Sequence, residues 1–100
     1  MFEVTAWNNG SDGYGFRIRK GDRDRYFSRK VSCINLFLPG NEDSIPINIT
    51  PPFWGNCPEL RSKSIRDWLC ANRHAPWTKG SPPKFNLEKI SDTDYRLIGL

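Results

Sequence analysis

Short stretches in which apolar and polar residues alternate constrain the fold of this chain more than any other feature. Ile45, Ile47 and Ile49 recur with a period of two, which is typical of a strand with one buried face. Pro46 lacks an amide proton, so we expect either an edge strand or the first residues of a strand here. The apolar run over residues 31–38 ends at a turn-forming Pro-Gly-Asn sequence, and we predict that it pairs with the isoleucine strand as a hairpin.

Further strands are expected elsewhere in the chain on similar grounds. They are predicted at residues 2–7, 14–19, 25–27, 84–90 and 95–100. Gly21 and Asp22 mark a turn, so residues 20–25 are predicted to form a charged hairpin tip. The last two strands are separated by a Ser-Asp-Thr-Asp sequence and are predicted to form a second hairpin.

One stretch, residues 58–72, has the spacing of an amphipathic helix. Its apolar stripe consists of Leu60, Ile65, Trp68 and Leu69. Asn56 is a suitable N-cap and Glu59 occupies the capping-box position. The basic residues Arg61, Lys63 and Arg66 are then expected to face water.

This order of elements predicts an α+β domain. We expect a curled antiparallel sheet of about six strands, partly barrel-like, with one amphipathic helix inserted before the last two strands. One hundred residues, of which 37% are hydrophobic and 13% aromatic, suffice for a single core, so residues 1–100 are predicted to form one domain.

Cysteine content and hydropathy bound the environment of the protein. No apolar run approaches the roughly 20 residues that cross a bilayer, and residues 1–7 lack the basic and apolar regions of a signal peptide. Cys33, Cys57 and Cys70 are too few and too scattered for a disulfide framework and are interpreted as structural thiols. We therefore expect a cytoplasmic protein without membrane contact, metal site or cofactor.

Positive charge is segregated along the chain. The formal net charge is +4. Residues 17–30 hold seven basic and two acidic residues, and residues 61–89 again hold seven and two, a net of +5 in each block. The rest of the chain must then carry a net of −6. The sequence does not show whether the two blocks adjoin in space.

The interleaving of arginines with aromatic residues favours nucleic-acid binding. The basic residues of the first block are Arg17, Arg19, Lys20, Arg23, Arg25, Arg29 and Lys30, and the aromatic ones are Tyr14, Phe16, Tyr26 and Phe27. Arginines bind phosphates and aromatic rings stack on bases. Our leading hypothesis is a non-enzymatic nucleic-acid-binding or regulatory module, whose surface Arg61, Lys63 and Arg66 would extend. A solvated face neutralised by local acids is the simpler interpretation of such a block.

Two other functions fit parts of the sequence. A protein-interaction or inhibitor module would use aromatic residues near loops, namely Trp7, Phe53, Trp54 and Trp77. A small metal-dependent nuclease would use Asp22 and Asp24. No nucleophile or phosphate-loop motif is present, and His74, the only histidine, follows the predicted helix, where a capping or solvated role is expected. Catalysis is therefore not predicted.

Overall fold

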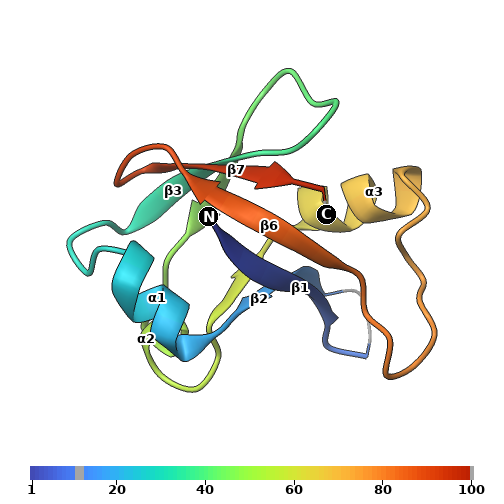
Figure 1. Ribbon diagram of the computed structural model, residues 1–100, viewed down its shortest axis with the longest axis horizontal. Helices are drawn as coiled ribbons and strands as arrows, with labels where there is room; N and C mark the ends of the chain where they lie inside the picture. Colours follow the sequence, from blue (N-terminus) through green and yellow to red (C-terminus); the bar gives the residue numbers. More distant parts are fainter. Residues whose placement is uncertain (11–12, 100) are drawn as a thin grey trace.

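The chain folds into one curled sheet with three short helices (Figure 1). The computed structural model describes residues 1–10 and 13–99. The elements in chain order are β1 (Phe2–Asn8), β2 (Tyr14–Ile18), α1 (Lys20–Tyr26), β3 (Cys33–Phe37), β4 (Ile45–Asn48), α2 (Pro51–Trp54), β5 (Glu59–Arg61), α3 (Lys63–Ala71), β6 (Lys84–Lys89) and β7 (Asp94–Ile98).

The sheet is mixed and nearly closed. Its seven strands have the order β4-β3-β7-β6-β1-β2-β5, and every neighbouring pair is antiparallel except β3 with β7. The parallel pair arises because the β3–β4 hairpin packs beside the β6–β7 hairpin, which lies far away in sequence. The two edge strands, β4 and β5, lie close to each other, so the sheet approaches a barrel.

The predicted fold class is confirmed. Five strands precede α3 and two follow it, and both predicted hairpins, β3–β4 and β6–β7, are present. Pro46 lies on edge strand β4, as its missing amide proton requires. The predicted end of the last strand, Leu100, lies outside the described residues.

The predicted charged hairpin at residues 20–27 is wrong, because residues 20–26 form helix α1. Arg23 and Phe27, four residues apart, are both buried, and Tyr26 packs against the core beside them. This is helical spacing. The sequence did not reveal this helical spacing, because the charges alternate and an arginine is not counted as an apolar position even when it is buried. Residues 51–54, for which no helix was predicted, form the single turn of α2.

The predicted start of the long helix is also wrong. Glu59–Arg61 form strand β5, in which Leu60 pairs with Phe16 of β2, and the helix begins at Lys63. The N-cap is Ser62, whose hydroxyl accepts a hydrogen bond from the Ser64 amide at 3.1 Å. Three residues are too few to display a period of two, so Leu60 could be assigned equally well to the helical stripe.

Aromatic side chains close the two ends of the curled sheet. At the end covered by α1 and α2, Phe27 stacks on Tyr95 with ring centroids 4.5 Å apart, and Phe53 packs against Phe27. At the end covered by α3, Trp68 packs against Phe85. The two helical ends lie on opposite sides of the molecule in Figure 1.

Candidate functional site

The cations of the first basic block do not gather on one surface. Arg23 is the clearest case, because it is 6% exposed and its guanidinium donates to the carbonyls of Phe53 at 3.1 Å and Gly55 at 2.9 Å. It also pairs with Asp24 at 3.0 Å, and this hydrogen bond lowers the pKa of Asp24. Arg23 therefore ties α1 to α2, which is a structural role.

The other cations on and after α1 lie at the same end of the barrel, away from α3 (Figure 1). Arg25 lies over the ring of Tyr26 at 5.4 Å, and Arg29 lies over Trp54 at 4.5 Å. Lys20 donates to the side chain of Asn56 at 3.3 Å. Lys30 is exposed. The two basic blocks therefore do not merge through α1.

Arg17 and Arg61 form one pair of cations that the fold brings together from the two blocks. They flank Glu59 on the outer side of the sheet, where Arg17 lies 3.3 Å and Arg61 2.8 Å from the Glu59 carboxylate. The Glu59 side chain is 1% exposed, whereas those of Arg17 and Arg61 are 55% and 54% exposed. The buried carboxylate thus holds two guanidiniums that remain accessible to a ligand.

A second shared carboxylate lies on the same outer side. Glu3 on β1 is 3.0 Å from Arg19 and 4.0 Å from Lys84 on β6. The strand register connects the two groups, because Thr5 is opposite both Arg17 and Lys84. We call this surface of β6, β1, β2 and β5 the outer sheet face; it comprises Glu3, Thr5, Trp7, Arg17, Arg19, Glu59, Arg61 and Lys84.

Trp7 is the aromatic residue of the outer sheet face. It is opposite Gly15 on β2, and Gly15 is opposite Arg61 on β5. Gly15 is required here, since a Cβ would lie within 2.1 Å of the Leu60 carbonyl oxygen. The guanidinium of Arg61 lies 4.5 Å from the Trp7 ring centroid, a cation–π contact.

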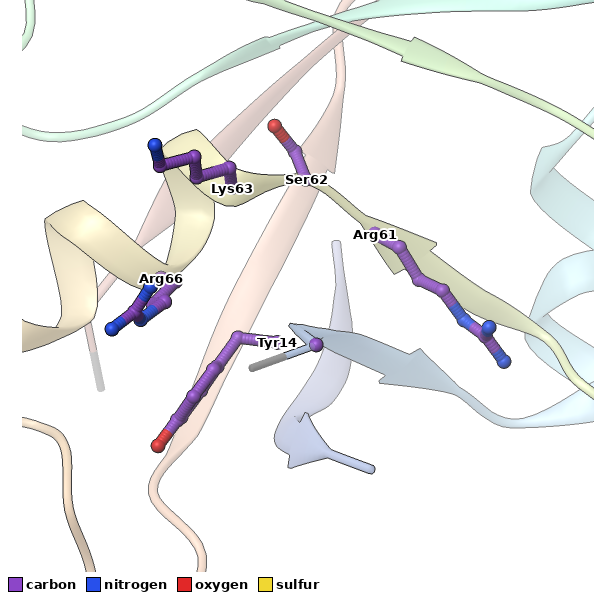
Figure 2. Close-up of a pocket in the computed structure, with 6 residues that line it drawn as sticks. Tyr14, Arg61, Ser62, Lys63 and Arg66 are labelled. Carbon is purple, nitrogen blue, oxygen red and sulfur yellow. The ribbon is translucent and has the colours of Figure 1, made fainter. Parts of the chain in front are cut away.

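A concavity of about 500 Å³ borders this face beside α3. Figure 2 shows Tyr14 and Arg66 extending to the same side, while Arg61 extends away from α3 along β5. Lys63 also lines the concavity. Among the described residues, no carboxylate lies within 4.0 Å of the charged groups of Lys63 and Arg66. Tyr14 packs edge-on against Trp77, with centroids 5.8 Å apart.

The four aromatic residues predicted for partner binding are scattered. Phe53 is 2% exposed and belongs to the core. Trp54 is half-buried beneath Arg29 at the α1–α2 end. Trp7 and Trp77, both half-buried, lie on or beside the outer sheet face.

The acidic and thiol side chains offer little chemistry. Asp22 and Asp24 lie on α1, with Asp24 paired to Arg23. Within residues 1–10 and 13–99, no three side chains of His, Cys, Asp or Glu gather as metal ligands. The three cysteines form no disulfide; Cys33 and Cys70 are exposed and Cys57 is half-buried.

Sequence reasoning missed Glu3, Glu59 and Lys84. The period of two does assign Glu3 to the outer side of β1, opposite the buried Phe2 and Val4. The contact between Lys84 and Glu3 depends on pairing between β1 and β6, whose paired residues are 79 to 85 positions apart, and no local pattern indicates such a register.

No protein-family model matches the chain, and no curated protein sequence or solved structure matches it either. None of the helices in the described part of the chain has the length and apolar character needed to span a bilayer.

Proposed function

We propose that the protein is a non-enzymatic nucleic-acid-binding module and that single-stranded nucleic acid lies across the outer sheet face and the α3 concavity. The site differs from the hairpin surface expected from sequence. It keeps Arg17, Arg19, Arg61, Lys63 and Arg66 and adds Lys84 in place of the cations on and after α1.

The concentration of charge is the observation that carries this proposal. The outer sheet face together with Lys63 and Arg66 holds six cations and two carboxylates, a formal charge of +4. The whole chain has 15 basic and 11 acidic residues, so nine of each lie elsewhere and cancel. The net charge of the chain therefore equals the charge of this one surface, as expected of an electrostatic footprint for phosphates.

The arrangement of side chains supports contact with single strands. Glu59 and Glu3 each contact two cations, which restricts these long side chains without covering them. Two half-buried aromatic rings accompany the cations: Trp7 lies under Arg61, and Tyr14 lines the α3 concavity. Cations beside accessible aromatic rings bind phosphates and stacked bases without sequence readout.

The four tryptophan indole N–H groups give this proposal a direct test. Trp7 and Trp77 lie at the proposed site, and Trp54 lies at the opposite end beneath Arg29. A mixed-sequence single-stranded oligonucleotide is titrated into ¹⁵N-labelled protein. We expect saturable shifts of the Trp7 and Trp77 indole signals and an unchanged Trp54 signal. Shifts confined to Trp54, or no shift at low salt, would contradict the proposal.

The same titration separates the rival functions. A nuclease would shorten the oligonucleotide after addition of Mg²⁺ or Mn²⁺, which gel electrophoresis detects. A protein-interaction module would leave all four indole signals unchanged with DNA and RNA. Either result would replace nucleic-acid binding as the assigned function.

A further inference from the structure

A second concavity, of about 480 Å³, lies beyond the C-terminal end of α3. Its aromatic lining consists of the half-buried His74 and of Trp68 and Phe85, whose residues are only 7% and 4% exposed; Pro39, Asn72 and Lys84 also line it. The Trp68 indole donates to the Pro39 carbonyl at 2.8 Å, which fixes this wall. Both its size and its mixture of aromatic walls with a few polar groups are typical of small-molecule sites.

The end of α3 places His74 in this cavity. The His74 amide donates to the Leu69 carbonyl at 2.8 Å, and the Arg73 amide donates to the Cys70 carbonyl at 3.2 Å. These two bonds form a Schellman motif. The His74 ring consequently stacks on Trp68 with centroids 5.4 Å apart, and it meets Phe85 at 5.0 Å.

Arg73 occupies the position of this motif that glycine normally fills. Its φ of 62° is left-handed, which costs a non-glycine residue about 1 kcal/mol. Both of its sequence neighbours, Asn72 and His74, line the cavity. Arg73 thus keeps an exposed side chain next in sequence to two lining residues, at a cost in backbone strain.

Among the described residues that line this cavity, Lys84 is the charged one. Arg73 lies between two lining residues, and no carboxylate is among the described residues that line it. A planar ring that carries an anionic group suits the half-buried His74 ring together with Lys84 and Arg73.

We propose that this cavity binds a nucleotide, with the base against the half-buried His74 ring and the phosphate beside Lys84 and Arg73. Lys84 also lies 4.0 Å from Glu3 on the outer sheet face, so the two surfaces adjoin. The nucleotide is therefore either free or the terminal nucleotide of a strand bound on that face; the second case rests on the proposed function.

The Trp68 indole and His74 imidazole signals test this site by NMR with three probes. Adenosine 5′-monophosphate is expected to shift both signals saturably. Adenosine should bind about tenfold more weakly, because it lacks the phosphate. Inorganic phosphate alone should shift the Trp68 and His74 signals less than adenosine 5′-monophosphate does. Absence of a saturable shift with adenosine 5′-monophosphate and with oligonucleotides, or equal binding of adenosine, would overturn the proposal.

Two variants separate binding from folding. Arg73→Gly relieves the left-handed strain, so we expect a higher unfolding midpoint together with about threefold to tenfold weaker nucleotide binding. Lys84→Ala should weaken binding similarly, and Lys30→Ala, an exposed lysine at the far end, is the matched control. If the nucleotide affinity is unchanged in both Arg73→Gly and Lys84→Ala, the phosphate does not lie beside these two residues and the proposal is wrong.

Two further comparisons distinguish the sources of the ligand and the two proposals. If a linear 5′-phosphorylated oligonucleotide shifts Trp68 and a circular single strand does not, the cavity takes strand ends. If only the mononucleotide shifts Trp68, it takes free nucleotides. The combined variant Arg61→Ala, Lys63→Ala and Arg66→Ala should keep its mononucleotide affinity. Nucleotide binding in the cavity can therefore be shown even if the outer sheet face binds no nucleic acid.

Discussion

The carboxylate of Glu59 lies 2.8 Å from the guanidinium of Arg61 and is itself almost inaccessible, since 1% of the Glu59 side chain is exposed. Arg17 contacts the same carboxylate from β2, so three charged groups join the edge strand β5 to the sheet. A buried charge that is deprived of its partners is costly, whereas exposed ion pairs contribute little. Glu59 is therefore the group on which the local arrangement depends.

Glu59→Gln is expected to lower the free energy of unfolding by about 1 to 3 kcal/mol, because each carboxylate oxygen accepts from a different arginine and the buried amide NH2 would face one of these donors. Urea unfolding followed by tryptophan fluorescence measures the change. The matched control is Glu88→Gln, whose carboxylate is 3.7 Å from Arg96 and 40% exposed. The control should change stability by less than about 0.5 kcal/mol, and equal effects of the two variants would contradict the account.

Arg23→Ala is expected to destabilise the protein by about 2 to 4 kcal/mol, because the carbonyls of Phe53 and Gly55 would be left without their donor inside the structure. Arg25→Ala, on the exposed side of α1, should change stability by less than about 0.5 kcal/mol. Thermal unfolding by circular dichroism compares the two variants. Comparable midpoints would show that Arg23 is not a structural residue.

Arg73→Gly is expected to raise the free energy of unfolding by about 0.5 to 1 kcal/mol, since glycine adopts the left-handed conformation at this helix end without steric cost. Gly80→Ala is the reverse control, because Gly80 has a φ of 85° and alanine should destabilise there. Chemical denaturation measures both. Destabilisation by Arg73→Gly would show that the arginine side chain stabilises the fold.

Stability should fall at alkaline pH because of Tyr95. Its buried hydroxyl donates to the Tyr26 carbonyl at 2.7 Å, and burial raises the pKa of Tyr95 to about 12. Below pH 10 the phenol is protonated in both the folded and the unfolded state, so its contribution is complete. Between pH 10 and 12 the unfolded state alone releases the proton, and stability falls by about 2 to 3 kcal/mol as the pH rises.

Tyr95→Phe separates this effect from other alkaline titrations. The variant should be less stable than the wild type by about 1 kcal/mol at neutral pH, since the Tyr26 carbonyl is then without its donor. The difference between the two proteins should shrink and reverse as the pH passes from 10 to 12. A constant difference over that interval would contradict the raised pKa.

The sequence predicted those strands whose alternation of apolar and polar residues extends over enough positions to show a period of two. The isoleucine alternation of β4 and the final hairpin were correct in element and partner, because a strand with one buried face repeats every two residues. α1 and β5 were not predicted, because α1 buries an arginine and β5 has three residues. Tertiary contacts determine both elements. Arg23 of α1 donates to the carbonyls of Phe53 and Gly55, and Leu60 of β5 pairs with Phe16.

The candidate site was predicted less well than the fold. Local composition identified Arg17, Arg61, Lys63 and Arg66 as candidates, but composition carries no information on which cations face the same side. Positions such as Arg29 and Lys84 look alike in sequence. Their separation depends on the pairing of β1 with β6 and on the placement of α1, which are long-range features.

The salt dependence of oligonucleotide binding tests the proposed outer sheet face most directly. The combined variant Arg61→Ala, Lys63→Ala and Arg66→Ala is compared with Arg25→Ala, Arg29→Ala and Lys30→Ala, which removes the same charge at the opposite end. We expect the first variant to bind a single strand more weakly than the wild type. Its slope of log K against log salt concentration should be shallower by about 0.7 for each phosphate that the protein no longer neutralises. The second variant should behave like the wild type. Equal weakening in both variants, or a wild-type affinity that does not change with salt, would contradict this account.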